Sequence, residues 1–257
     1  MTVALIFGCT LLGLVVGSFL NVVIHRIPLH LSVVSPRSNC PNCATPIAMR
    51  DNVPVLSWLV LHGHCRSCHA PISARYLGVE LLTAVLFAST AARLGAVWAL
   101  PAFLMLVAGL IALACTDLEH QLLPLRIVYP VLGLVGALLL LAAVATDEWG
   151  RLLTGVIAGL VWSALFFTIN AASPRVLGFG DVRLVLLIGL GLGWLGVGEV
   201  AIGFFAANLI GAAIGVGLLA TRRATRSTPV PYGVFLAAGA MIALFSGPSL
   251  LAHYRFG

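Results

Sequence analysis

Hydrophobic residues along the chain gather into eight blocks of roughly membrane-spanning length. We place these blocks at residues 3–24, 78–94, 97–116, 128–146, 152–171, 183–197, 199–220 and 231–249. A helix needs about twenty consecutive apolar residues to cross ~30 Å of hydrocarbon. Most connections between the blocks are short and contain Gly, Pro, Asp or Arg. The pattern predicts an all-α polytopic membrane protein with about eight transmembrane helices lying in a lipid bilayer.

One connection differs from the others, because residues 26–77 form a polar insertion of about fifty residues between the first two blocks. We therefore expect three parts: a first transmembrane helix over residues 1–25, a loop domain over 26–77, and a seven-helix membrane domain over 78–257. Composition agrees, since 61% of the residues are hydrophobic and only 9% are charged. Soluble domains carry about 25% charged residues, so an ordinary soluble domain is excluded.

The net charge of +6 rests on 14 basic residues, all of them arginine. A basic balance in a soluble protein would point to nucleic acid; here arginine placement predicts membrane orientation, and we expect no nucleic-acid partner. If the 26–77 loop is cytoplasmic, the connections near 117–127, 172–182 and 221–230 share its side. That side then holds eleven arginines: Arg26, Arg37, Arg50, Arg66, Arg75, Arg126, Arg175, Arg183, Arg222, Arg223 and Arg226. The opposite side keeps three, Arg93, Arg151 and Arg255, so both termini should lie outside.

Two C-x-x-C pairs mark the polar insertion. They are Cys40-Pro41-Asn42-Cys43 and Cys65-Arg66-Ser67-Cys68, with 21 residues between them. Two such pairs can supply the four thiolates of a closed structural zinc site. Two disulfides or a redox pair are the alternatives, and a reducing cytoplasm disfavours the first. We expect zinc on all four cysteines, with His62, His64 and His69 as surface neighbours.

Acidic residues near membrane depth are costly and therefore informative. Asp117 ends the third predicted helix and Asp181 begins the sixth, so both reach the same membrane face. Two carboxylates that share a site favour one ionised and one protonated group, which suits activation of water against a peptide bond. Gly178 and Gly180 permit an unwound backbone just before the sixth helix. A proton relay of a transporter would use similar acids, and helix capping is a simpler role for both.

The order of short motifs resembles that of the prepilin leader peptidases, also called type IV leader peptidases. The segments that carry the resemblance are Gly17-Ser18-Phe19-Leu20-Asn21, the two cysteine pairs, Asn52-Val53-Pro54-Val55-Leu56, Glu80, Asp117 with Leu122-Leu123-Pro124, Gly178-Phe179-Gly180-Asp181 and Pro231-Tyr232-Gly233. They cover nearly the whole chain in the family's order. The glycine-rich segment is similar to the G-x-G-D segment of presenilin-like peptidases.

The resemblance implies cleavage of the basic leader from type IV prepilins or type II secretion pseudopilins at the cytoplasmic face of the bacterial inner membrane. It also implies that members with the cysteine loop N-methylate the new N-terminus with S-adenosylmethionine. By position, the resemblance assigns catalysis to Asp117 and Asp181. Our candidates for the methylation half are Phe19, Asn21, Arg26 and Glu80. The chain departs from the family pattern at Leu125, at Arg183 and at Leu77-Gly78, none of which removes a catalytic group or a zinc ligand.

Two other classes compete with the peptidase hypothesis. A proton-coupled transporter would use Asp117 and Asp181 as ion-binding carboxylates and would give the cysteine loop no evident role. A membrane anchor or scaffold would bind a partner through that loop and would make both acids incidental. Cys9 and Cys115 lie within predicted helices, and we expect them to pack as small apolar side chains.

Overall fold

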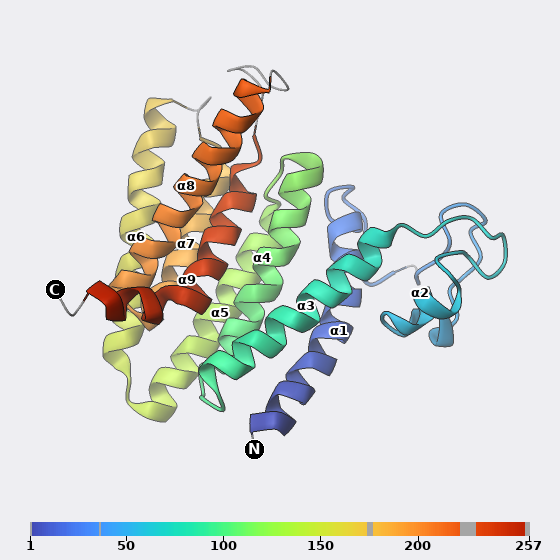
Figure 1. The fold of residues 1–257 in the computed structure, drawn as a ribbon, viewed down its shortest axis with the longest axis horizontal. Coiled ribbons are helices and arrows are strands. Elements are labelled where there is room, and N and C mark those ends of the chain that lie inside the picture. The colour runs from blue at the N-terminus through green and yellow to red at the C-terminus, as the bar shows by residue number, and fades with distance from the viewer. Residues whose placement is uncertain (1, 36, 174–176, 222–229, 255–257) are drawn as a thin grey trace. The chain divides into compact units, whose positions relative to one another are not determined.

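The structure is a computed structural model that describes residues 2–35, 37–173, 177–221 and 230–254, with side chains up to residue 246. Eight long helices lie in this part of the chain (Figure 1): α1 Thr2–Arg26, α3 Ala74–Leu94, α4 Leu100–His120, α5 Leu125–Thr146, α6 Trp149–Ala172, α7 Phe179–Leu195, α8 Val197–Ala220 and α9 Tyr232–Tyr254. Two short elements, the 3-10 helix η1 Met49–Asn52 and α2 Leu56–Val60, lie between α1 and α3. The predicted all-α class is confirmed, with each of the eight apolar blocks forming a helix.

Within the described residues, six helices are long and apolar enough to cross a membrane: α1, α3, α4, α5, α6 and α8. α7 has 17 residues, and the apolar stretch of α9 over Tyr232–Ser246 is also short. The chain is therefore a membrane protein, while the exact number of eight spans stays a prediction. Of the arginines used to predict orientation, Arg175, Arg222, Arg223, Arg226 and Arg255 lie outside the described residues.

The local prediction about Gly180 was wrong. Gly180 belongs to the first turn of α7, which begins at Phe179, so the irregular backbone before this helix ends at Gly178. The glycine-rich run near the end of α7 is helical as well, because its glycines pack against neighbouring helices. Only Gly196, with φ +155°, forms the turn between α7 and α8. This φ suits glycine, since a Cβ there would be strained.

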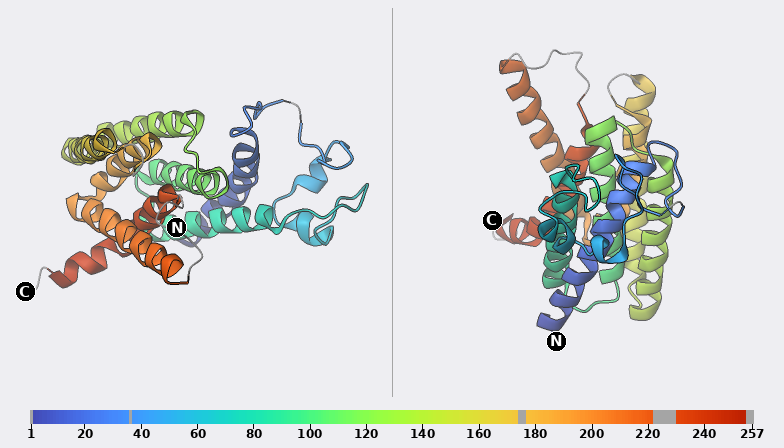
Figure 2. Two further views of the ribbon diagram at one scale, coloured as in Figure 1. Left: turned by 90° about the horizontal axis from the view of Figure 1, so that it is seen from above. Right: turned by 90° about the vertical axis from the view of Figure 1, so that its right-hand side faces the viewer.

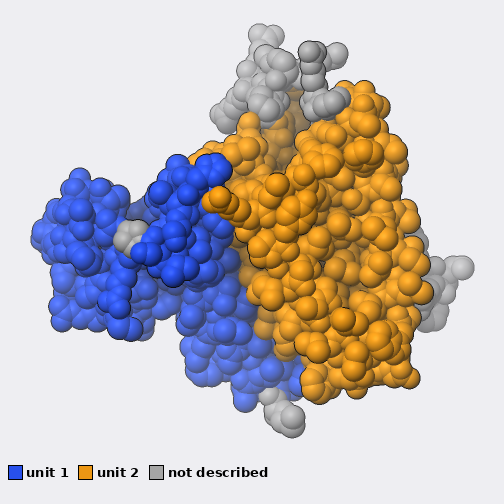
Figure 3. All heavy atoms as spheres, turned by 180° about the vertical axis from the view of Figure 1, so that it is seen from behind, with its two compact units in different colours: residues 1–96 blue, residues 97–257 orange. Residues whose placement is uncertain are grey.

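The chain divides into two compact units, residues 1–96 and residues 97–257, which Figure 3 colours separately. The first unit contains α1, η1, α2 and α3, and the second contains α4 to α9. The cysteine loop and both of its flanking helices thus belong to one unit. The domain boundary that we expect at residue 78 stays a prediction.

In the first unit, α1 and α3 pack directly against each other. A Cβ added to Gly13 would lie 2.6 Å from the Cα of Ala84, and one added to Gly17 would lie 2.7 Å from the Cα of Glu80. Such distances mean that the two backbones touch with no side chain between them. Small residues permit this close approach, which favours dispersion contacts in a membrane interior where helices gain little from hydrophobic burial.

In the second unit, α4 is the most buried of the six membrane-length helices, with 78% of its apolar window inside the protein. It contacts α5, α7 and α9. The neighbouring pairs α6 with α7 and α8 with α9 run side by side (Figures 1 and 2). Glycines again permit the approach, since a Cβ on Gly189 would lie 2.6 Å from the Cα of Gly159. Gly239 likewise faces the backbone of Gly203.

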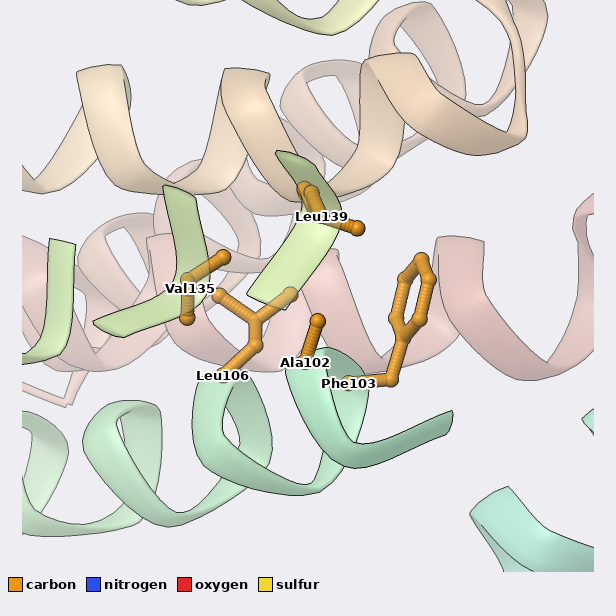
Figure 4. A pocket seen from close by; sticks show the side chains of 6 residues that line it. Ala102, Phe103, Leu106, Val135 and Leu139 are labelled. Atoms are coloured by element: carbon orange, nitrogen blue, oxygen red, sulfur yellow. The ribbon is translucent and has the colours of Figure 1, made fainter. Parts of the chain in front are cut away.

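A small hollow lies between α4, α5 and α7 (Figure 4). Its walls are the apolar residues Ala102, Phe103, Leu106, Val135, Leu139 and Gly191. It has no room for a water molecule and no polar lining. The hollow is therefore a packing defect of the core, since a binding pocket needs both space and placed polar groups.

Candidate functional site: an acid pair and a cysteine cluster

Asp117 lies in the last turn of α4 and is buried, with 5% of its surface exposed. Its Oδ2 accepts a hydrogen bond of 3.2 Å from the backbone N–H of Val234, in the first turn of α9. A Cβ on Gly233 would lie 2.8 Å from the same oxygen. The glycine therefore leaves the space in which the Asp117 carboxylate meets the start of α9.

Asp181 is the third residue of α7 and is 8% exposed. Its Oδ2 accepts a hydrogen bond of 3.1 Å from the backbone N–H of Gly178, the residue that precedes the helix. This bond satisfies one of the amide groups that a helix leaves unpaired at its start, and a negative charge is favoured there by the helix dipole. The Gly178 segment is anchored from α6, since Asn170 Nδ2 donates to the carbonyl of Leu177 at 2.6 Å.

Packing brings the segments that carry Asp117 and Asp181 close to each other. Leu123, in the connection between α4 and α5, packs between the segments that hold them. Its side chain would lie 2.9 Å from a Cβ on Gly180 and 3.1 Å from one on Gly233. Three motifs far apart in the sequence thus meet around one leucine. The arrangement supplies two buried acids from different helices at one end of the second unit.

Sequence reasoning named Tyr232 only as part of a motif, and it missed Asn208 and Phe166 near this pair. The hydroxyl of Tyr232 donates to Oδ1 of Asn208 on α8 at 3.1 Å, and its ring stacks on Phe166 of α6 with centroids 6.3 Å apart. Asn208 also donates to the carbonyl of Phe204, one turn back. The sequence signal that could have found Asn208 is its place as a lone amide in a mostly apolar helix, because polar groups at membrane depth need a partner.

Arg183, one of the departures from the family pattern, lies against aromatic rings. Its guanidinium carbon is 4.3 Å from the ring centroid of Phe179 and 5.7 Å from that of Tyr129 on α5. A guanidinium stacks on a ring face through its plane and is weakly hydrated, which an ammonium cannot match. The aromatic contacts therefore give a physical reason for arginine at this position.

The four cysteines of the loop form one cluster, since their sulfur atoms all lie within 4.8 Å of one another. The sulfurs of Cys40 and Cys68 are 3.8 Å apart, which is too far for a disulfide. Tetrahedral zinc with bonds of ~2.3 Å requires sulfur separations of about 3.8 Å. Among the described residues no other metal-binding group was found, and the donor set fits zinc.

Both cysteine pairs fold into the same local turn. The N–H of Cys40 donates to the carbonyl of Thr45 at 3.0 Å, and the N–H of Cys65 donates to that of Ala70 at 2.9 Å. The residues after the second cysteines, Ala44 and His69, both have φ +56°. His69 is thus the backbone equivalent of Ala44 in the turn, and neither it nor His62 and His64 joins the cluster.

Hydrogen bonds prepare the thiols for metal binding, because a thiolate is the ligating form. They lower the pKa of three of the four thiols: that of Cys43 chiefly through the Thr45 hydroxyl, and those of Cys65 and Cys68 chiefly through the backbone N–H groups of Cys68 and Ala70. Cys9 is buried in α1 as expected. Cys115 is half-buried in α4.

Two contacts fix the cluster within its loop. Arg66, between the second pair of cysteines, forms an ion pair of 2.7 Å with Asp51 of η1. Trp58 of α2 donates from its indole nitrogen to the carbonyl of Ile72 at 3.3 Å, and its ring packs on Gly63, which has φ +69°. The segment of the second cysteine pair therefore packs against both short helices, η1 and α2.

The candidates for methylation lie around the end of α1. Asn21 and Glu80 are both buried and lie along the line of contact between α1 and α3, whereas Phe19 is 54% exposed. Arg26 donates to the carbonyl of Ser32 at 3.0 Å, just beyond α1. The structure thus brings Asn21 and Glu80 to one interface and leaves Phe19 apart from them.

Fold and site define a helical membrane protein in which one unit holds two buried aspartates around a common leucine and the other a cysteine cluster with the geometry of a metal site. Family models match both units: one described as "Bacterial Peptidase A24 N-terminal domain" covers residues 11–94, and one described as "Type IV leader peptidase family" covers residues 104–216. The chain is therefore an enzyme of the type IV leader peptidase family.

Curated relatives agree over nearly the full length. A protein from Aeromonas hydrophila is 37% identical, with 95% of this chain and 91% of the relative covered. One from Bacillus subtilis (strain 168) is 36% identical, with 94% of both chains covered. Both are named "Prepilin leader peptidase/N-methyltransferase". The search of solved structures gave no match.

Proposed function

We propose that this enzyme cleaves the leader peptide from type IV prepilins or type II secretion pseudopilins and N-methylates the residue exposed by the cut. The substrates carry a basic leader and an apolar N-terminal helix. Family membership and the names of the relatives support both activities. The peptidase assignment rests on the packing that holds buried Asp117 and Asp181 around Leu123 at one end of the second unit.

In the proposed mechanism, two buried carboxylates act together to cleave the peptide bond. The ionised member takes a proton from a water molecule, which then attacks the carbonyl carbon of the scissile peptide bond. The protonated member donates a hydrogen bond to the carbonyl oxygen and supplies the proton that the leaving amine requires. Gly178 and Val234 donate backbone N–H groups to these acids, so the orientation of each carboxylate is fixed before substrate binds.

We place the enzyme in the bacterial cytoplasmic membrane with its loop and acid pair facing the cytoplasm and both termini outside. The arginine asymmetry supports this orientation. In that reducing compartment Cys40, Cys43, Cys65 and Cys68 hold a structural zinc ion rather than disulfides. The zinc stabilises the loop that belongs to the methylating half, for which S-adenosylmethionine is the methyl donor.

The test is cleavage of a synthetic prepilin-like peptide by purified protein in detergent, followed by mass spectrometry. We expect cleavage after the glycine that ends the leader, and loss of at least about 1000-fold in kcat in both Asp117→Asn and Asp181→Asn. Asp147→Asn is the matched control, because Asp147 is an exposed residue that directly follows α5. Normal cleavage by either active-site variant would refute the two-aspartate mechanism, and a folded wild type without cleavage would favour transport.

A further inference from the structure

Asn21 carries a buried oxygen that accepts no hydrogen bond. The side chain is 2% exposed, and its Oδ1 is the buried side-chain polar atom without a partner among the described residues. The amide nitrogen Nδ2 donates to the carbonyl of Tyr76 at 3.0 Å. Because a carbonyl cannot pair with a second carbonyl, this bond fixes which end of the amide faces Tyr76. A buried acceptor without a donor is destabilising and calls for an explanation.

Glu80 supplies a second acceptor beside it. The residue is 8% exposed, and its Oε2 accepts from the N–H of Val55 at 2.7 Å. Among the described residues, the carboxylate forms no ion pair and its Oε1 accepts no hydrogen bond. A largely buried carboxylate without a cation is costly, and its Oε1, unlike the oxygen of Asn21, is not fully enclosed, so a cationic group can reach it.

Asn21 and Glu80 are about one helical turn apart along the contact between α1 and α3. The position of Gly17 faces the backbone of Glu80, and Asn21 follows Gly17 by four residues. The carbonyl of Tyr76 accepts the hydrogen bond from the Asn21 amide. Tyr76 precedes Glu80 by four residues, so in a regular helix the same carbonyl accepts the N–H of Glu80. The register of the two helices therefore places the Asn21 amide against Tyr76, one turn of α3 from Glu80.

Glu80 also connects this position to the cysteine loop. Val55 has φ 63° and ψ −53°, a conformation that a β-branched residue adopts only when its surroundings enforce it. The Glu80 carboxylate holds the N–H of this strained residue, which begins α2. The two unpaired acceptors thus lie at the junction of α1, α3 and the loop that carries the candidate zinc ligands.

A primary amine is the group that fits these two acceptors. It has two N–H bonds to donate, and donation of both leaves its lone pair unengaged. A water molecule could pair with Asn21, but it would not offset the charge of Glu80, whereas an amine in its protonated form does. We propose that Asn21 Oδ1 and Glu80 Oε1 form the binding site for a primary amine in the methylation reaction. This inference rests on the methylation included in the proposed function.

The site would act by positioning the amine. Before the transfer, the protonated N-terminus of the peptide loses one proton to water, which frees the lone pair of its nitrogen. That lone pair forms the new N–C bond while the S–C bond of the methyl donor breaks and its electron pair stays on sulfur. The additional proton on nitrogen then leaves to water. Both the N-terminus of the cleaved peptide and the amino acid end of S-adenosylmethionine present a primary amine, so the experiment must separate these two sources.

The variants are Asn21→Leu, which removes the unpaired oxygen at similar size, and Glu80→Gln, which removes the charge and keeps an acceptor for Val55. Thr10→Val on α1 and Glu148→Gln are the matched controls; Thr10 bonds only within its own helix, and Glu148 pairs with Arg151 in the second unit. The readouts are methylation of a peptide that already lacks its leader, equilibrium binding of S-adenosylmethionine, leader cleavage, and the melting temperature.

We expect both variants to lose at least tenfold in kcat/KM for methylation, with cleavage unchanged and the melting temperature of Asn21→Leu equal or higher. A raised KM for the peptide with unchanged donor binding would assign the site to the peptide amine; weaker donor binding would assign it to the donor. Wild-type-like methylation in both variants would overturn the inference and leave only a buried water at Asn21. No methylation by wild type would instead refute the proposed activity.

Discussion

Replacing Gly233 with alanine tests whether the start of α9 holds the Asp117 carboxylate. The new Cβ would lie 2.8 Å from Oδ2, whereas ordinary contact begins at 3.4 Å, so the oxygen must move by about 0.6 Å (3.4 − 2.8). The N–H of Val234 is 3.2 Å from the same oxygen. A shift of this size away from α9 stretches that hydrogen bond beyond the useful range.

The expected cost follows from the bond that is lost. A hydrogen bond to a charged group contributes about 1.5–3 kcal/mol, which corresponds to about a 10- to 150-fold decrease in kcat if the bond persists in the transition state. Substrate binding does not involve this bond, so KM should stay within about twofold. Loss of the bond should also lower the free energy of unfolding, and the preference of a helix for alanine over glycine, up to ~1 kcal/mol, offsets part of that loss.

The assay is the initial rate of peptide cleavage at several substrate concentrations, together with the melting temperature of the same preparations. Gly215→Ala is the control, because a Cβ at Gly215 of α8 meets nothing within 4 Å. The reasoning fails if Gly233→Ala retains the wild-type kcat while remaining folded. A decrease in kcat accompanied by an equal decrease in the control would also refute a specific role for Gly233.

Three further predictions concern the first unit. Removal of zinc with a chelator should expose residues 26–77 to proteolysis and abolish methylation, because the loop has little apolar core of its own. Restoring zinc should reverse both effects. Unchanged protection from proteolysis after chelation would contradict the metal site. Gly17→Ala should destabilise the α1–α3 contact by about 1–3 kcal/mol, measured by thermal unfolding, whereas Gly8→Ala on the same helix, with nothing within 4 Å, should be neutral. Arg66 holds the pKa of the Asp51 carboxyl below its usual 3.8, so the pair stabilises the loop above that pH and the effect is lost as pH falls through the lowered pKa. The difference in proteolysis between wild type and Asp51→Asn should therefore stay constant from about pH 7 to about pH 5.

The sequence predicted those features whose signal is local. The apolar blocks predicted each long helix. The two-residue spacing within each cysteine pair predicted the cluster, since the local turn of such a pair depends only on its own residues. Asp117 and Asp181 were also found, because an acid beside an apolar helix stands out. The error at Gly180 arose because a glycine in the first turn of a helix is indistinguishable, by composition, from one in the segment before it.

Contacts between segments far apart in the sequence could not be predicted from such local patterns. The role of Leu123 depends on which helices meet at one end of the second unit, and nothing in its apolar side chain indicates that. The pairing of Tyr232 with Asn208 likewise depends on the register of α8 against α9. The sequence marked Asn21 and Glu80 only through resemblance; the unpaired oxygen that distinguishes Asn21 emerges from the packing of α1 on α3.

The two proposed reactions, cleavage and methylation, are assigned to different compact units of the chain. The family models end at residue 94 and begin again at residue 104, and the division between the units falls at residues 96 and 97. Every contact invoked for the acid pair lies within the second unit, and every contact invoked for the cysteine cluster and the amine site lies within the first. Each set of side chains is therefore positioned by the packing of its own unit. A single polypeptide can then carry out two successive reactions on one N-terminus without requiring the residues of either site to serve in the other.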